Sequence, residues 1–199
     1  MSQVSKEHYN KYDSYYRFAT YWAQIEEVKD IKSILEIGCG NKTVANYLID
    51  KGYDVTTVDF AVDLEPDILA DIRNLDLKQK YDCVLCCEVL EHLPLKDLDK
   101  ALGRIQLHTA TYAIISVPNY CAKIAFTIQI MNFLKTIRFN IPAFFTKPKF
   151  TGEHYWGLGQ WGISKREFRK RLRKAGFKII KEKYPSIFNG CYFFVCEVS

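Results

Sequence analysis

The sequence predicts an α/β fold with a doubly wound, mostly parallel sheet. Short apolar segments alternate along the chain with segments of helical periodicity, which is the element order of such sheets. The segment at 83–87 is almost wholly apolar, as expected for a strand covered on both faces. At 199 residues the chain is long enough for one full hydrophobic core, so we expect a single domain over residues 1–199.

Apolar patterning and the residues that end each segment define the individual elements. Spaced aromatic residues at 7–29 predict an N-terminal helical extension. Ser164 and Glu167 have the spacing of a capping box at the start of the last helix, and Gly176 ends that helix. Strands are expected at 34–37, 55–58, 68–70, 83–87, 113–117, 177–181 and 192–198, and helices at 43–50, 98–108 and 164–176.

Residues 119–163 break the alternation and are predicted to form an insertion after the fifth strand. If 122–139 is helical, six apolar residues fall on one stripe, namely Ala122, Phe126, Ile130, Phe133, Leu134 and Ile137. We therefore expect a helical lid or substrate-binding insertion. The pattern leaves three alternatives: a lid over an apolar substrate, contact with an anionic membrane surface, or packing on the core.

The N-terminal residues and the cysteines indicate the cellular compartment in which the protein is expected. Residues 1–6 show no apolar signal region, and no run of 18 uncharged apolar residues is present. Seven cysteines, most of them in strand-like apolar segments, are typical of reduced thiols. We expect a cytoplasmic protein, with peripheral membrane contact as the alternative.

Charge is distributed unevenly between the two halves of the chain. Residues 1–99 contain 11 Lys and Arg against 19 Asp and Glu, whereas residues 100–199 contain 17 against 4. Such asymmetry favours an anionic partner for the second half, either a membrane surface or RNA. The alternative is two solvated faces of opposite sign, and the basic helix that follows Ser164 matches no nucleic-acid-binding module. The pattern does not predict an oligomeric state.

A glycine turn joins the first strand to the first helix of the sheet. Gly38-Cys39-Gly40 allows the backbone to approach a ligand closely, and the helix N-terminus adds oriented N–H groups. Asp59 lies 21 residues after Gly38 at the end of the second strand, the position for a carboxylate that accepts from ribose hydroxyls. Phe60 follows it. The turn therefore predicts a nucleotide-type site.

Two other nucleotide folds are excluded by the same segment. A nicotinamide-binding turn would have glycine at position 43, where this chain has Thr43. A P-loop would need glycine directly before Lys-Thr, and Asn41 stands there instead.

The pattern Glu36-x-Gly38-x-Gly40 resembles the acid-x-Gly-x-Gly signature of the class I S-adenosylmethionine-dependent methyltransferases. This resemblance implies that the loop, with Cys39, holds the methionine part of the cofactor and that Glu36 orients its amino group. Lys42 stands where many members have a third glycine.

Further segments carry the resemblance over residues 30–120 and, less closely, over 150–199. Asp71 resembles the acid that bonds the adenine amino group, and Ile72 would contact the ring. Glu88 to Pro94 resembles the segment after the fourth strand. The implied fold is a seven-stranded Rossmann-like sheet with an antiparallel last strand.

Glu88, Glu91 and His92 are candidate metal ligands. At i, i+3 and i+4 they would share one face of a helical turn and could bind Mg, Mn, Zn or Fe. The E-x-x-E-H spacing resembles two metal-using branches, the small-RNA 3′-terminal 2′-O-methyltransferases and the quinone-biosynthesis O-methyltransferases. Without a metal, His92 would brace the loop or act as a base. Glu91 and His92 are therefore also candidate catalytic residues, and Glu88 is a candidate cofactor contact.

His154 is a third candidate catalytic residue, in a stretch rich in glycine and aromatic residues. It could act as a general base or as a further metal ligand. The alternative is a loop histidine packed on Trp156 or Trp161.

The resemblance implies methyl transfer from S-adenosylmethionine to an O or N atom of a small apolar or anionic acceptor. Two alternatives are an RNA 2′-O-methyltransferase with a divalent metal and a non-catalytic, S-adenosylmethionine-binding regulatory protein. Glu36, Asp59 and Asp71 are all present, which argues against the non-catalytic alternative.

Overall fold

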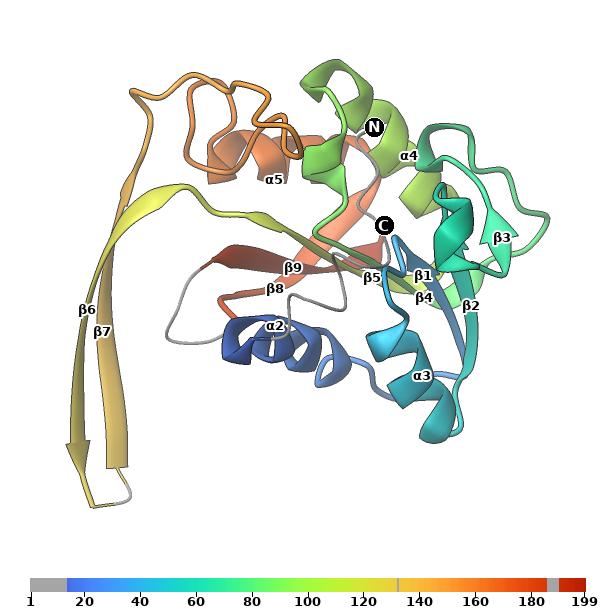
Figure 1. The fold of residues 1–199 in the computed structure, drawn as a ribbon, viewed down its shortest axis with the longest axis horizontal. Coiled ribbons are helices and arrows are strands. Elements are labelled where there is room, and N and C mark those ends of the chain that lie inside the picture. The colour runs from blue at the N-terminus through green and yellow to red at the C-terminus, as the bar shows by residue number, and fades with distance from the viewer. Residues whose placement is uncertain (1–13, 132, 186–189) are drawn as a thin grey trace.

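A computed structural model describes residues 14–131, 133–185 and 190–199. Its main element is a seven-stranded sheet with the strand order β3-β2-β1-β4-β5-β9-β8 (Figure 1). The strands of this sheet are β1 (Ser33–Ile37), β2 (Asp54–Asp59), β3 (Ile68–Leu69), β4 (Tyr81–Cys87), β5 (Thr109–Pro118), β8 (Phe177–Lys183) and β9 (Cys191–Val198). The α-helices are α2 (Tyr15–Ile25), α3 (Thr43–Asp50), α4 (Leu98–His108) and α5 (Lys165–Lys174). Short 3-10 turns lie at η1 (Val62–Leu64), η2 (Ile72–Asn74), η3 (Leu90–His92) and η4 (Leu95–Asp97).

The direction of the strands confirms the predicted topology. β1 pairs in parallel with β2 and β4, β2 pairs in parallel with β3, and β4 pairs in parallel with β5. β9 runs antiparallel to both β5 and β8. The parallel strands therefore end at one edge of the sheet, where ligands bind in folds of this type.

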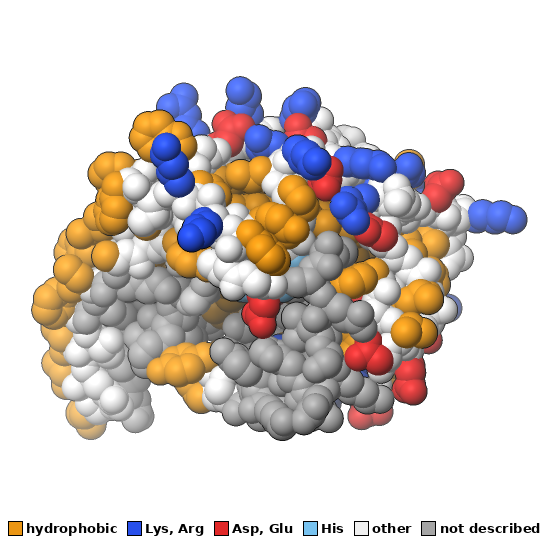
Figure 2. All heavy atoms as spheres, turned by 45° about the horizontal axis from the view of Figure 1, so that its top comes forward, with side chains coloured by type: hydrophobic (Ala, Val, Ile, Leu, Met, Phe, Trp, Pro, Cys, Tyr) orange, Lys and Arg blue, Asp and Glu red, His pale blue; other side chains and the backbone are white. Residues whose placement is uncertain are grey.

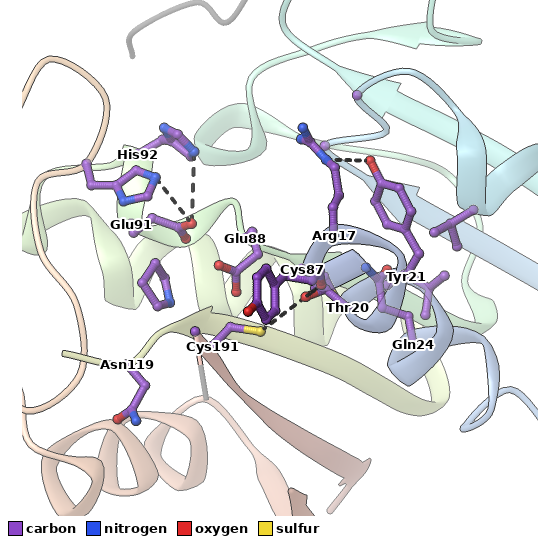
Figure 3. Close-up of a pocket in the computed structure, with 18 of the residues that line it drawn as sticks. Arg17, Thr20, Tyr21, Gln24, Cys87, Glu88, Glu91, His92, Asn119 and Cys191 are labelled. Atoms are coloured by element: carbon purple, nitrogen blue, oxygen red, sulfur yellow. Dashed lines mark hydrogen bonds and ion pairs between the residues drawn. The ribbon is translucent and has the colours of Figure 1, made fainter. Parts of the chain in front are cut away.

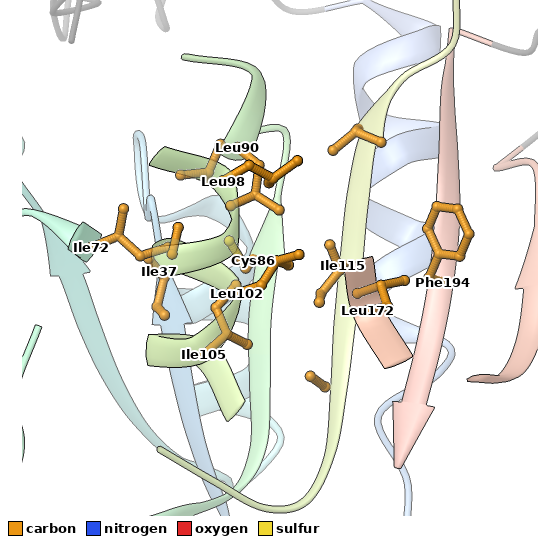
Figure 4. Packing of buried hydrophobic residues seen from close by; sticks show 14 of the residues in the cluster. Ile37, Ile72, Cys86, Leu90, Leu98, Leu102, Ile105, Ile115, Leu172 and Phe194 are labelled. Carbon is orange, nitrogen blue, oxygen red and sulfur yellow. The ribbon is translucent and has the colours of Figure 1, made fainter. Parts of the chain in front are cut away.

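Helices cover both faces of the sheet. α2 and α3 bury Ala23, Val44 and Leu48 in a cluster with residues of β1, β4, β5 and β9. On the other face, α4 and α5 bury Leu102, Ile105, Phe168 and Leu172 in the larger core cluster (Figure 4). Cys83 and Cys86 of β4 belong to opposite clusters, as strand alternation requires.

Local side-chain bonds explain where two helices begin. Ser14 caps α2, since its side chain accepts a hydrogen bond from the backbone N–H of Arg17 at 3.3 Å. Ser164 caps α5 in the same way and accepts from the N–H of Glu167 at 3.1 Å. The predicted extension at 7–29 is thus helical over Tyr15–Ile25, and residues 7–13 lie outside the described part of the chain.

The helical insertion predicted within 119–163 is wrong. The structure has an antiparallel hairpin there, formed by β6 (Cys121–Ile130) and β7 (Phe133–Pro142). Apolar residues occur at every second position from 122 to 130, and isoleucine, phenylalanine and threonine favour strands. The period-two pattern therefore prevails over the weaker helical stripe. Among the described residues, no helix is long and apolar enough to cross a membrane.

Candidate active site

A cavity of about 770 Å³ opens at the carboxyl edge of β1, β4 and β5 (Figure 3). It brings together the glycine turn after β1, the segment after β4, the end of β5 and the helix α2, which are far apart in sequence. Its lining includes Arg17, Thr20, Tyr21, Gln24, Glu36, Gly38, Cys39, Gly40, Asn41, Cys87, Glu88, Glu91, His92, Asn119, Tyr120, Glu153, His154 and Cys191.

The glycine turn is held tightly against the segment after β4. Gly38 has φ +77° and Gly40 has φ +52°, both in the left-handed region that favours glycine. A Cβ atom at Gly38 would lie 2.3 Å from Cγ2 of Val89. Lys42 continues the turn with φ 59° and gives α3 no side-chain cap. The turn can therefore lie this close to Val89 only because position 38 has no side chain.

Glu36 places a buried carboxyl on the wall of this cavity. Its side chain is almost fully buried, and Oε2 has no hydrogen-bond partner among the described residues. Burial raises the pKa of Glu36 to about 8, against the opposing effect of a backbone hydrogen bond from Ala45. An unpartnered carboxyl oxygen beside a glycine turn is suited to a cationic group of a ligand.

Asp59 supports the turn from the end of β2. Its Oδ1 accepts from the N–H of Ala61 at 3.0 Å. Burial raises the pKa of Asp59, while backbone hydrogen bonds from Ala61, Phe60 and Gly40 act in the opposite direction. Asp59 and Phe60 do not belong to the lining of this cavity.

Asp71 and Ile72 also lie outside the cavity lining. Asp71 caps the turn η2 by accepting from the N–H of Arg73 at 2.8 Å, and it forms an ion pair with the Arg73 guanidinium at 2.5 Å. Ile72 is buried in the core cluster. The structure therefore brings Glu36 and the glycine turn together, while the predicted adenine contacts belong to a separate, already paired turn.

Glu88 differs from its expected position on a helical face. Its backbone is left-handed, with φ +56°, and the helical turn η3 begins only at Leu90. Glu88 is therefore out of helical register with Glu91 and His92. Its carboxyl accepts from the Ser116 hydroxyl at 2.7 Å, and burial raises the pKa of Glu88 to about 7.

Glu91, His92 and His154 form a cluster whose donor atoms all lie within 4.8 Å of one another. Oε1 of Glu91 is 3.9 Å from Nε2 of His92 and 4.0 Å from Nε2 of His154 (Figure 3). The Glu91 side chain is fully buried, and neither of its oxygens has a hydrogen-bond partner among the described residues. Burial and the neighbouring Glu88 raise the pKa of Glu91.

Contacts orient the two imidazoles, and burial disfavours their protonated forms. Nδ1 of His92 lies 3.0 Å from the backbone carbonyl of Glu153, which can only accept, so Nδ1 carries the proton and Nε2 faces Glu91. Burial, together with His154, lowers the pKa of His92 to about 4, and burial also lowers the pKa of His154. The rings meet edge to face, 4.8 Å apart. His154 thus packs on His92, which the sequence did not predict.

The loop that carries His154 is fixed by close contacts. Trp156 is buried and donates from Nε1 to the carbonyl of Leu93 at 2.9 Å. A Cβ atom at Gly157 would lie 2.1 Å from the Tyr120 ring, and one at Gly159 would lie 2.3 Å from the Tyr120 carbonyl. The glycines of this segment therefore allow it to lie against the end of β5, where Tyr120 enters the cavity.

Sequence reasoning missed the wall formed by α2. Arg17, Thr20, Tyr21 and Gln24 all line the cavity. Ion pairs between Lys183 of β8 and the glutamates that follow α2 hold the helix in place, including Glu27 at 2.5 Å. The aromatic spacing at 15–22 indicated a helix, but nothing in it indicated which surface the helix would cover.

Comparison with known proteins matches this chain to a methyltransferase domain model over residues 7–182. No curated protein matches. Three solved methyltransferase structures are similar to this chain. An S-adenosylmethionine-dependent methyltransferase from Clostridium acetobutylicum is 15% identical, with TM-score 0.65 and 97% of each chain covered. The 1,6-didemethyltoxoflavin-N1-methyltransferase from Burkholderia thailandensis is 14% identical, with TM-score 0.64 and coverage of 97% of this chain and 82% of that one. The amino pentose methyltransferase CalS10 from Micromonospora echinaspora is 12% identical, with TM-score 0.60 and coverage of 97% and 95%.

Proposed function

The chain belongs to the S-adenosylmethionine-dependent methyltransferases, because the methyltransferase domain model spans residues 7–182, and we propose that it methylates an O or N atom of a small molecule. One observation carries the proposal: a single cavity runs from the glycine turn with Glu36 to the buried cluster of Glu91, His92 and His154. The first part suits the cofactor and the second suits the acceptor.

The residues of the turn fit S-adenosylmethionine. Glu36 offers a buried oxygen without a partner for the ammonium group, and Gly38 and Gly40 leave backbone groups accessible. The roles predicted for Asp59 and Phe60 on the ribose side, and for Asp71 and Ile72 on the adenine side, would require the cofactor to extend beyond this cavity lining, and Asp71 would also have to exchange its pairing with Arg73. The bound cofactor supplies an activated methyl group, so the protein contributes mainly orientation and electrostatics.

A proton must leave the acceptor when the nucleophile is a hydroxyl or an ammonium group. His92 and His154 lie where they can take it, and burial lowers the pKa of each, which favours the unprotonated form although it weakens the base. Nε2 of His92 is unprotonated in the tautomer that its contact with Glu153 requires. Oε1 of Glu91 lies 3.9 Å from Nε2 of His92 and 4.0 Å from Nε2 of His154, so these nitrogens can act as a base only when no metal ion is bound there.

We propose further that Glu91, His92 and His154 bind a divalent transition cation such as Zn, Fe or Mn. A buried carboxylate without hydrogen bonds is unfavourable unless a cation pairs with it. Two ligands that are each about 2.1 Å from one ion lie at most about 4.2 Å apart. Glu91 meets both histidines at 3.9 and 4.0 Å, and the three donor atoms lie within 4.8 Å of one another, so the two imidazoles would close slightly around a bound ion. Such an ion would supply Lewis acidity that lowers the pKa of an acceptor hydroxyl. Mg is less suited to two imidazoles.

A small acceptor is favoured over RNA. The basic helix α5 is already paired with acids, since Arg169 meets Glu182 at 2.8 Å and Arg171 meets Asp99 at 2.6 Å. Fewer of its cations are therefore available to follow a phosphate backbone.

A cofactor-consumption screen over quinols, phenols, amines and RNA ends, with and without divalent metals, tests the proposed reaction. We expect turnover with a small acceptor and loss of turnover in His154→Ala with retained cofactor binding. Turnover with RNA ends alone, or no turnover with any small acceptor, would contradict the proposal.

Metal binding has its own readout, the metal content of the purified protein and calorimetric titration with zinc. Glu91→Gln should abolish zinc binding, whereas Glu197→Gln, the same change at a partly exposed carboxyl on β9, should leave it unchanged. Equal zinc affinity in both variants would refute the metal site without affecting the methyltransferase proposal.

A further inference from the structure

The hairpin formed by β6 and β7 stands apart from the main sheet. Its strands pair only with each other over ten residue pairs, and it projects from one side of the molecule (Figure 1). A two-stranded hairpin is marginally stable in water unless one face is covered. The side chains that this hairpin exposes therefore indicate which kind of partner would cover it.

One face of the hairpin is apolar and exposed. The register places Ile124 opposite Phe139, Phe126 opposite Ile137, and Ile130 opposite Phe133. Alternate residues of a strand share a face, so these side chains lie together. Phe126 is 61% exposed and Ile137 is 49% exposed. We name the apolar face by its members, Ile124, Phe126, Ile128, Ile130, Phe133, Ile137, Phe139 and Ile141.

The apolar surface continues beyond the strands. Met131 at the tip is 89% exposed, and Phe144 and Phe145, which follow β7, are also exposed. Figure 2 shows hydrophobic side chains in a band along this edge of the molecule. A band of this extent exceeds the scattered apolar residues of an ordinary surface and indicates an interaction site.

The charge of this segment is of one sign only. Residues 121–152 contain Lys123, Lys135, Arg138, Lys147 and Lys149 and no Asp or Glu. Lys135 lies opposite Ile128 on the apolar face itself, where its long stem can pack while its ammonium group reaches polar surroundings. Apolar residues combined with cations complement a surface that has an apolar interior and anionic headgroups.

We propose that the apolar face of the hairpin docks this protein on an anionic lipid surface. A second copy is a poorer occupant, since a symmetric pair would enclose Lys135 of both copies between two apolar faces. Tyr120, Cys121 and Ala143, at the base of the hairpin, line the cavity. Docking would therefore set the cavity mouth beside the lipid, where an apolar acceptor is concentrated. That last consequence rests on the proposed function, whereas the docking does not.

Vesicle co-sedimentation of the full chain tests the docking. We expect binding to vesicles of equal parts phosphatidylcholine and phosphatidylglycerol and little binding to phosphatidylcholine alone. The double variant Phe126→Ser, Ile137→Ser should bind at least tenfold more weakly, because two apolar anchors are removed. Lys147→Gln with Lys149→Gln should weaken binding to anionic vesicles by roughly fivefold per lysine.

The matched control changes two similarly exposed apolar residues on the body, Ile49→Ser with Val62→Ser, and should leave vesicle binding unchanged. A Phe126→Trp variant gives a second readout, since its emission should shift to the blue on anionic vesicles.

Absence of vesicle binding in the wild type would overturn the proposal, as would equal loss in the control variant. Sedimentation as a dimer that Phe126→Ser, Ile137→Ser converts to a monomer, without vesicle binding, would assign the face to a second copy instead. Each outcome is independent of methyl transfer.

Discussion

Replacing Glu36 with glutamine should stabilise the protein above neutral pH while weakening cofactor binding. The carboxyl is buried, and its Oε2 has no hydrogen-bond partner among the described residues. Its ionised form is therefore unfavourable in the folded chain that holds no ligand. The same group would pair with the ammonium group of S-adenosylmethionine, so stability and binding should change in opposite directions.

The magnitude follows from the pKa of Glu36, which burial raises from 4.5 to about 8. A carboxyl with a raised pKa favours the folded state while protonated, so its contribution is fully present below pH 4.5 and is lost as the pH rises toward 8. Within that window the free energy of unfolding falls by about 1.4 kcal/mol per pH unit. The expected loss from about pH 5 to pH 8 is roughly 3 kcal/mol.

Urea unfolding at the two pH values measures this directly. The decline in Glu36→Gln should be smaller than in the wild type by roughly 3 kcal/mol, because Glu88 and Glu91, whose pKa values burial also raises, contribute to the decline in both chains, while Glu197→Gln should retain the full decline. Calorimetry should show at least tenfold weaker S-adenosylmethionine binding in Glu36→Gln, in line with about 1.5–3 kcal/mol for a hydrogen bond to a charged group. Equal pH dependence in Glu36→Gln and the wild type would refute the reasoning about burial, and unchanged affinity would refute the assigned role.

Three further changes test other contacts. Gly38→Ala should lower stability by about 1–3 kcal/mol and abolish cofactor binding, since its Cβ would lie 2.3 Å from Val89, and unaltered affinity would contradict this. Lys183→Met should lower stability by about 1–2 kcal/mol at neutral pH, because it removes the ion pair with Glu27. Burial raises the pKa of Glu27, but hydrogen bonds from Lys181 and Lys183 outweigh burial and lower that pKa. The difference in the free energy of unfolding between Lys183→Met and the wild type should therefore shrink as the pH falls. A difference that stays constant with pH would argue against the ion pair. Trp156→Phe should lower stability by about 1–2 kcal/mol through loss of its bond to Leu93, as thermal unfolding would report, and an unchanged melting temperature would count against that anchor.

Short-range patterns predicted most of the sheet and the glycine turn. The apolar segments around Ile34 and Val84 became central parallel strands, and Gly38 and Gly40 have the positive φ expected of a ligand-binding turn. These features depend on residues that are close together in the sequence, so the sequence pattern alone predicts them. The hairpin was missed because residues 122–139 satisfy two periods at once, and exposed strands have no core to select between them.

The arrangement of the candidate site depended on long-range contacts. His154 joins Glu91 and His92 because glycines 157 and 159 let their loop lie against Tyr120 and because the N–H of Tyr155 donates to the carbonyl of Glu91 at 2.8 Å. The spacing from 88 to 92 predicted a shared helical face, but the left-handed backbone of Glu88 interrupts the helical register. No local pattern reports either feature, since both follow from how distant segments pack.

Calorimetric titration of the wild-type chain with S-adenosylmethionine tests the central claim most directly. The cavity with Glu36, Gly38 and Gly40 on its wall predicts saturable binding of one cofactor molecule per chain at micromolar concentrations. The same titration with Glu36→Gln should show markedly weaker binding of S-adenosylmethionine. No detectable binding by a folded wild-type chain would contradict the account of this cavity.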